Sequence, residues 1–195
     1  MMNEYKSLAA QHLSGSVSVS KPASPNTVIF DSPAVEVMTD LRKIQAAVIT
    51  PETPMEIANT YMIQRGVRTL LVMHDDSLVG IITASDILGE KPMRFIQERG
   101  VKHSEILVMD IMTPLDKLEA IPLEEVMHAR VGNIVSSLRE SGRMHALVMD
   151  DHSIGLPRIC GIFSWTQIEK QLGTTIPPTN VAKSFAEIES TLIAN

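Results

Sequence analysis

Cysteine and long apolar runs are scarce in this chain of 195 residues. Its one cysteine, Cys160, excludes an intrachain disulfide and favours a reducing, cytoplasmic setting. No apolar run approaches the roughly 18 residues of a membrane span, and residues 1–15 lack the apolar region of a signal peptide. We therefore expect neither membrane insertion nor secretion.

Basic and aromatic side chains are also in short supply. The chain has 17 Lys and Arg against 23 Asp and Glu, a net charge of −6, and only one Trp, two Tyr and four Phe. Nucleic acid polymers and anionic membranes attract basic surfaces, and base stacking needs aromatic rings. We expect neither as a partner. The apolar fraction of 44% is ordinary for a folded protein with a sizeable core.

The sequence contains an internal repeat. The matching blocks are Met38-Thr39 with Met112-Thr113, Gly66–Met73 with Gly142–Met149, and Gly80–Thr83 with Gly161–Ser164. Their offsets are 74, 76 and 81 residues, so the order is kept and only the insertions between blocks grow. Three blocks in register indicate two copies of one unit, at residues 33–89 and 108–173.

The first copy has a clear pattern of secondary structure. Strands are predicted at 44–49, 68–73 and 78–83, a helix from Met55 to a stop at Gly66, and a short helix from Ser85. This strand-helix-strand-strand-helix unit spans about 55 residues, which is marginal for independent stability. We therefore predict an α+β fold, in which tandem β-α-β-β-α repeats pack sheet to sheet with pseudo-two-fold symmetry.

Three segments flank or join the copies. Residues 1–32 are predicted to be a partly disordered N-terminal tail, and residues 90–107 a connecting helix. Residues 174–195 carry apolar side chains at helical spacing, which predicts a C-terminal helix. That helix either docks on its own domain or binds a partner.

The most informative segment is 78–88, in which a strand containing Gly80 runs directly into a helix start. Free N–H groups and partial positive charge at a helix start favour an anion such as phosphate. Thr83 and Ser85 offer hydroxyl groups there, and the Asp86 carboxylate can accept both hydroxyls of a ribose. The alternative is structural: Thr83 or Ser85 caps the helix, and Asp86 favours its dipole.

This pattern, Gly-Ile-Ile-Thr-x-x-Asp at 80–86 behind a Met-Thr opening and repeated once, resembles the CBS domain, named after cystathionine β-synthase. Two such domains in tandem resemble a Bateman module, and the likeness covers residues 32–173. We expect a stand-alone bacterial module. The resemblance implies two clefts between the copies, with an adenosine nucleotide in the competent one.

The resemblance also implies roles for individual residues. Thr83 and Asp86 would hold the ribose with Ser85 as a helper, and Arg68 would contact phosphate. The opposite copy would supply an apolar wall for adenine, although Glu119 beside it would repel phosphate. The implied nucleotide-binding residues are Thr83, Asp86, Ser85, Arg68, Ile81, Ile121 and Ala120. None of these groups requires a metal ion.

The second copy departs from this pattern. Gln167 stands where the first copy has Asp86, and Met144 stands where it has Arg68, although Arg143 and His145 flank it. A neutral amide accepts hydrogen bonds less strongly than a carboxylate. The second cleft is therefore either empty or binds something else.

Two functional hypotheses remain open. The resemblance implies a non-enzymatic regulatory module that binds AMP, ADP or ATP and signals occupancy to a partner protein on another chain. The alternative is a structural or protein-interaction module with a vestigial, ligand-free cleft. No catalytic or metal-ligand motif is evident in the sequence, so we expect neither enzyme activity nor a metal.

The resemblance further implies a homodimer formed through helix faces. Met55, Met62, Met93 and Met127 are the candidates for its adaptable apolar surface. Light scattering tests this expectation, because the chain alone has a mass of 21.4 kDa.

Overall fold

The computed structural model describes residues 8–20, 28–151 and 155–177. The predicted C-terminal helix lies, from residue 178 onward, outside the described residues, as do parts of the predicted N-terminal tail. Within the described part of that tail, residues 8–20 are exposed and contain no helix or strand. Residues 28–32 differ from the prediction, because Val28 is only 7% exposed and belongs to the core of the second copy. None of the described helices is long and apolar enough to cross a membrane.

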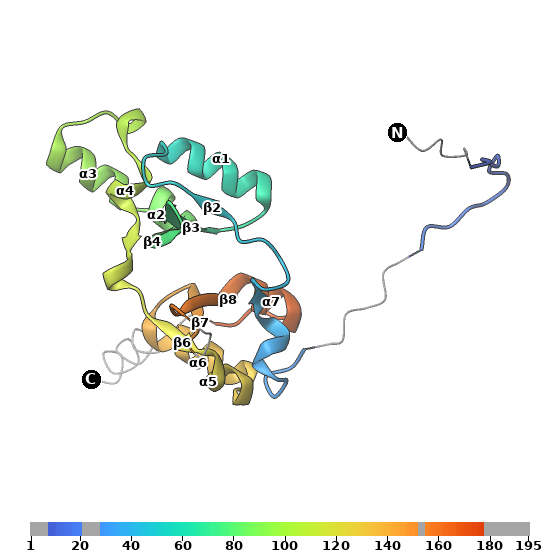
Figure 1. The fold of residues 1–195 in the computed structure, drawn as a ribbon. Helices are drawn as coiled ribbons and strands as arrows, with labels where there is room; N and C mark the ends of the chain where they lie inside the picture. The colour runs from blue at the N-terminus through green and yellow to red at the C-terminus, as the bar shows by residue number, and fades with distance from the viewer. Residues whose placement is uncertain (1–7, 21–27, 152–154, 178–195) are drawn as a thin grey trace, which may run out of the picture.

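Two four-stranded sheets form the centre of the molecule (Figure 1). One has the strand order β2-β3-β4-β5 and the other the order β1-β8-β7-β6. In each sheet a parallel pair is followed by an antiparallel hairpin, as the repeat predicts. The strands are β1 (Thr39–Asp40), β2 (Val48–Ile49), β3 (Thr69–His74), β4 (Ser77–Thr83), β5 (Thr113–Pro114), β6 (Ala120–Pro122), β7 (His145–Asp150) and β8 (Arg158–Ser164).

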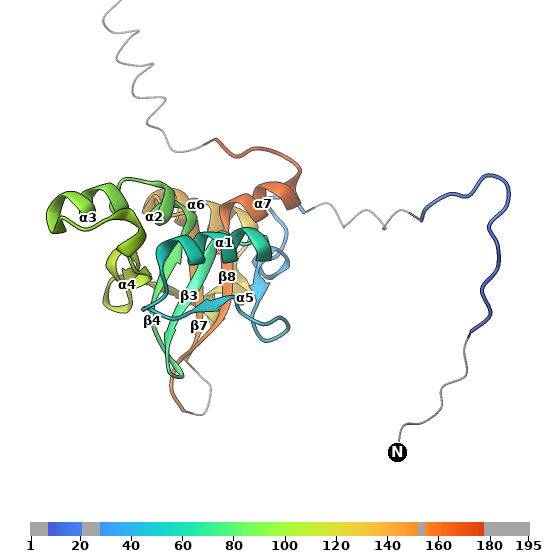
Figure 2. The same ribbon diagram turned by 90° about the horizontal axis from the view of Figure 1, so that it is seen from above.

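Helices lie outside the two sheets and complete the predicted α+β fold, which is confirmed. Figure 1 shows α1 above one sheet and α5 and α6 below the other, and Figure 2 shows both hairpins pointing the same way. The helices are α1 (Met55–Arg65), α2 (Ala84–Leu88), α3 (Lys91–Arg99), α4 (Val108–Ile111), α5 (Leu123–His128), α6 (Val131–Ser141) and α7 (Trp165–Leu172). Short 3-10 turns are η1 (Ala34–Val37), η2 (His103–Glu105) and η3 (Leu115–Lys117).

The opening strand of each copy joins the sheet of the other copy. Strand β5, from the start of the second copy, pairs with β4, with Thr113 opposite Ile81. Strand β1, from the start of the first copy, pairs with β8, with Thr39 opposite Ile162. The sequence predicted sheets packed together but not this reciprocal exchange, because two-residue strands carry no periodic signal.

The exchange extends into both hydrophobic cores. The core beneath the first sheet includes Val108 and Ile111 of α4, which precede β5. The core beneath the second sheet includes Ala34 and Val37 of η1, which precede β1. All four side chains are at most 2% exposed. Each copy therefore completes its apolar core only with residues of the other.

The exchanged strands leave no room for a side chain on the strand they cover. A Cβ atom at Gly80 would lie 2.6 Å from the Thr113 carbonyl oxygen and 3.1 Å from Met112 Sδ. A Cβ atom at Gly161 would collide with the side chain of Met38. The Met-Thr block of each copy thus contacts the Gly-Ile block of the other, which is why both blocks recur in the sequence.

The methionines proposed for a dimer surface fall into two groups. Met93 and Met127 are 56% and 58% exposed. Met55 and Met62 are 1% and 2% exposed and belong to the first core. The expectation for these two was wrong, because they share the face of α1 that packs on its own sheet. The homodimer itself stays a prediction.

Replacing Gly80 with Ala should lower the free energy of unfolding by about 1–3 kcal/mol, because the added methyl group meets backbone that cannot move aside. Gly161→Ala is the matched control. There the obstacle is a flexible methionine side chain, so the loss should stay below about 1 kcal/mol. Urea unfolding of both variants measures the difference. Equal losses would contradict the tight crossing at Gly80.

Candidate functional site

A cavity of about 300 Å³ lies between the two copies at the start of α2. We call it the central cavity. Ile81 and Thr83 of β4 and Ser85 and Asp86 of α2 line one side. The other lining residues are Thr113, Leu118, Glu119, Gly142, Arg143, Met144, His145 and Leu147. Four of the seven nucleotide-binding residues expected from the sequence therefore share one cavity.

Thr83 and Asp86 form a hydrogen-bonded cap at the start of α2. The Asp86 backbone N–H donates to Thr83 Oγ1 at 3.3 Å. The backbone N–H and the hydroxyl of Thr83 donate to Asp86 Oδ2 at 2.8 and 2.7 Å. The structural role that the sequence offered as an alternative is therefore present. The cap places two hydrogen bonds on Asp86 Oδ2 and none on Asp86 Oδ1.

The Asp86 carboxylate has a further partner that the sequence did not reveal. Asp86 is only 8% exposed, and Lys91 Nζ lies 2.6 Å from its Oδ1 atom. The same ammonium group donates to the Ile111 carbonyl oxygen at 3.0 Å. A buried carboxylate requires such pairing. Because a carboxylate offers about four acceptor positions, Oδ1 keeps one for a ligand.

A smaller cavity of about 160 Å³ adjoins the central cavity, and Glu119, Arg143 and His145 line both. We call it the adjoining cavity. Ala120 and Ile121 of β6, expected to form the wall for adenine, line this adjoining cavity and not the central one. The lining is completed by Ser137, Leu138, Ser141 and Ala146. It thus offers a largely apolar compartment beside a polar one.

Two arginines lie close to these cavities in different ways. Arg68 lines a narrow cavity of about 20 Å³ together with Ser85 and Met144, and it does not line the central cavity. Arg143 lines both the central and the adjoining cavities, and its guanidinium lies 3.0 Å from a Glu119 carboxylate oxygen. The repeat alignment pointed to position 68, because it could not show which side chains of the second copy reach across.

The cleft related by the repeat has different chemistry. Its cavity, of about 470 Å³, is lined by Thr39, Leu41, Ile44, Gln45, Ala46, Ala47, Gln64, Arg65, Val67, Thr69 and Ile162. Ser164 precedes α7 without a side-chain cap bond and contacts the Thr166 hydroxyl at 3.2 Å. Gln167 is exposed. Neither Ser164 nor Gln167 lines this cavity, so the two clefts are unequal.

His145 lies where the central, adjoining and narrow cavities meet. Burial, and after it the positive charge of Arg68, lower the pKa of His145 to about 4, while the negative charge of Asp86 opposes the shift. The folded protein therefore keeps this imidazole neutral at physiological pH.

The free energy of unfolding should fall as the pH is lowered from about 6.5 to about 4. In that range the unfolded chain protonates His145, whose ordinary pKa is 6.5, but the folded chain does not. The loss by pH 5 should be about 2 kcal/mol. Urea unfolding of wild type and His145→Gln at pH 7 and pH 5 isolates this contribution, because the other histidines are common to both. Identical pH dependence would contradict it.

Within the described residues, no group of three or more His, Cys, Asp or Glu side chains could hold a metal ion.

Residues 34–92 match the family model of the CBS domain. The chain is also 31% identical, over 100 residues, to inosine-5'-monophosphate dehydrogenase of Thermoplasma acidophilum. That match spans 51% of this chain but only 19% of the enzyme, and it falls in the enzyme's CBS-domain region.

Solved structures share the fold. A conserved protein from Pyrococcus horikoshii has a TM-score of 0.55 and 22% identity, covering 78% of this chain and all of that one. CBSX2, a CBS-pair protein of Arabidopsis thaliana whose structure was solved in complex with AMP, has a TM-score of 0.51 and 20% identity, covering 71% and 94%. Together these findings show that residues 34–92 match the CBS domain and that the described fold is shared with structures of CBS-pair proteins.

Proposed function

We propose that the central cavity binds an adenosine nucleotide and that its occupancy regulates a partner protein. The observation that carries this proposal is the central cavity itself, which brings Thr83, Ser85 and Asp86 to face Arg143 of the other copy. The AMP complex of CBSX2, a protein of the same fold, supports the choice of ligand.

The ribose would lie against the capped start of α2. Asp86 Oδ1 retains one acceptor position, because Lys91 occupies another and the cap engages only Oδ2. Thr83 Oγ1 donates to Asp86 and accepts from one N–H, so it too retains an acceptor position. The two ribose hydroxyls would therefore bond to one oxygen of each residue. Capping and ligand binding are compatible at this site.

The purine would occupy the adjoining cavity. Its lining by Ala120, Ile121 and Leu138 suits an apolar base face, and it opens beside the polar central cavity along Glu119 and Arg143. A nucleotide could thus place its base and its sugar in neighbouring compartments. Burial of the flat base there would supply affinity through the removal of apolar surface from water.

Arg143 is the phosphate contact that the geometry favours. A guanidinium can grip two phosphate oxygens at once, and Arg143 is the arginine that lines the central cavity. Without ligand its partner is Glu119. Phosphate would replace the Glu119 carboxylate as the partner of Arg143. The repulsion expected between Glu119 and phosphate would then be relieved, because Glu119 can turn away once it loses this contact. Arg68 would meet only phosphate groups that extend past Ser85.

The alternative function is a protein-interaction module that binds no nucleotide. The capped α2 start favours it, since Thr83 and Asp86 already have partners within the chain. The two functions differ in one measurement: thermal shift by AMP, ADP and ATP, each without a divalent metal. A concentration-dependent rise in melting temperature supports the nucleotide site, and its absence supports the alternative.

Asp86→Ala should weaken adenosine nucleotide binding by about tenfold to a hundredfold. Loss of a hydrogen bond to a charged group costs about 1.5–3 kcal/mol, and each 1.4 kcal/mol is about tenfold in affinity. Gln167→Ala, the equivalent change in the second copy, should alter affinity by less than about threefold. Calorimetry measures both values.

A lost helix cap could weaken binding through stability alone, so a second readout is needed. Wild type should prefer AMP to its 2',3'-dideoxy analogue, and Asp86→Ala should abolish that preference. The melting temperature of each variant without ligand serves as the control. A folded Asp86→Ala protein that keeps both affinity and preference would remove Asp86 from the site.

Arg143→Gln should weaken AMP binding by about tenfold, in line with the loss of one charge-assisted contact, while adenosine binding stays within about twofold. Glu119→Gln should strengthen AMP binding, because Arg143 no longer has a competing carboxylate. Arg68→Gln is the matched control and should have the smaller effect on AMP. A larger effect of Arg68→Gln would reassign the phosphate contact to Arg68.

A further inference from the structure

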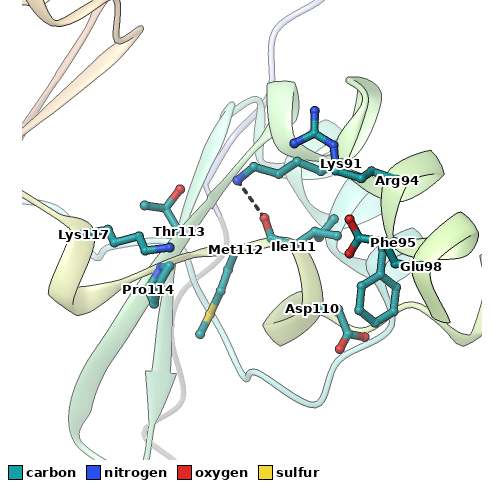
Figure 3. Close-up of a pocket in the computed structure, with 10 residues that line it drawn as sticks. All are labelled: Lys91, Arg94, Phe95, Glu98, Asp110, Ile111, Met112, Thr113, Pro114 and Lys117. Carbon is teal, nitrogen blue, oxygen red and sulfur yellow. Dashed lines mark hydrogen bonds between the residues drawn. The ribbon is translucent and has the colours of Figure 1, made fainter.

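A further pocket lies outside the cleft, among α3, α4, β5 and η3 (Figure 3). We call it the outer pocket, and its volume is about 260 Å³. Lys91 and Arg94 of α3 and Lys117 of η3 bring three positive charges to its lining. Neither the repeat nor the nucleotide proposal accounts for this cluster, because α3 belongs to the connection between the copies.

Comparison of the two copies shows why Lys117 has no ion pair among the described residues. Lys43 is the equivalent lysine of the first copy, and its ammonium lies 3.6 Å from the Asp40 carboxylate. In the second copy Pro114 stands at the position of Asp40. Among the described residues Lys117 has no ion pair, and it lines a pocket in which a negative ligand could replace the missing carboxylate.

Lys91 connects the outer pocket to the central cavity. Its ammonium has three donors, of which Asp86 and the Ile111 carbonyl take two. The third remains for a ligand. Thr113 lines both the outer pocket and the central cavity. The two spaces are therefore linked by a shared residue, Thr113, and by the ion pair between Lys91 and Asp86.

Acidic side chains in the outer pocket lie apart from the lysines. Figure 3 draws the Lys91 and Lys117 ammonium groups and the Thr113 hydroxyl on one side, and Glu98 and Asp110 beside Phe95 on the other. The Asp110 carboxylate is engaged at the start of α4, where it accepts the Leu107 N–H at 2.8 Å. The basic side of the outer pocket is thus suited to an anion.

We propose that the outer pocket binds the phosphoryl group of a small organic phosphate. Two lysines, one arginine and a hydroxyl offer enough donors for three phosphoryl oxygens, and a doubly charged group suits them better than a carboxylate. The carbon body of the ligand would pack on Phe95, Met112 and Pro114. This site is separate from the nucleotide site and stands without it.

Methyl NMR with phenyl phosphate as the probe tests the proposal at constant ionic strength. The methyl groups of Met112 and Ile111 report on the outer pocket, and those of Ile81 and Ile121 report on the central and adjoining cavities. Phenyl phosphate should shift the first pair saturably, and benzoate should do so at least about fivefold more weakly. Inorganic phosphate should bind the same residues without the aromatic contribution.

Matched variants separate the site from general electrostatics. Lys117→Gln and Arg94→Gln should each weaken the shift of Met112 by about fivefold or more. Lys43→Gln and Arg99→Gln remove the same charge at the repeat-equivalent position and on the same helix, outside the pocket, and should leave affinity within about twofold. All four side chains are exposed. Two of them have carboxylate partners in the chain: Lys43 lies 3.6 Å from Asp40, and Arg94 lies 3.5 Å from Glu90.

The outcomes are distinct from those of the nucleotide proposal. Shifts confined to Ile81 and Ile121 would assign phenyl phosphate to the cleft and overturn the outer pocket as a site. Equal losses of phenyl phosphate affinity in Lys117→Gln and Lys43→Gln would also overturn the outer pocket as a site. The absence of a saturable shift of Met112 would do the same. A failure of AMP binding would not contradict the outer pocket as a site, because the shifts of the Met112 and Ile111 methyl groups are measured with phenyl phosphate and without AMP.

Discussion

The crosswise pairing of β1 with β8 and of β5 with β4 is the constraint on which this structure depends. It forces the backbones together at Gly80, where the Thr113 carbonyl leaves no space for a side chain. It also carries η1 and α4 into the cores of the opposite copies. Because Thr113 is fixed against Ile81, the end of β4 and the start of α2 face the second copy, and the central cavity follows from that placement.

The two copies share a backbone arrangement but differ in the polar and charged side chains that they carry at equivalent positions. Thr83 and Asp86 cap α2 and hold Lys91, whereas Ser164 and Gln167 form no such cap at α7. Similarly, Asp40 neutralises Lys43, whereas Pro114 leaves Lys117 without an equivalent partner. A duplicated fold keeps the backbone constraint in both halves and varies the charges that the backbone does not require.

Much of the fold could be predicted from the sequence, and the reasons are physical. Apolar runs ending at polar turns located both hairpins, and the stop at Gly66 reflects a left-handed backbone with φ of 64°. The exchanged strands could not be predicted, because two residues are too few for an alternating pattern. Met55 and Met62 were misassigned, since a helical stripe shows that a face is apolar but not what covers it.

The candidate site was predictable only where its residues are adjacent in the sequence. Thr83, Ser85 and Asp86 lie on one strand-to-helix junction, and the structure keeps them together. Lys91 and Arg143 reach the site through tertiary packing, one across α2 and one from the other copy. Their contributions depend on distances that spacing along the chain does not encode, which is why the repeat predicts a phosphate contact at position 68 rather than at position 143.

The exchange of strands also determines the order in which the chain can reach its native state. Thr39 of β1 pairs with Ile162 of β8, which lies far from it in the sequence. While a ribosome synthesises the protein, β1 must therefore remain unpaired until Ile162, 123 residues further along the chain, has emerged. Long-range pairing of this kind slows folding and leaves strand edges exposed in the meantime. The first copy, although complete in sequence much earlier, has to wait for β5 and α4 before its core can close.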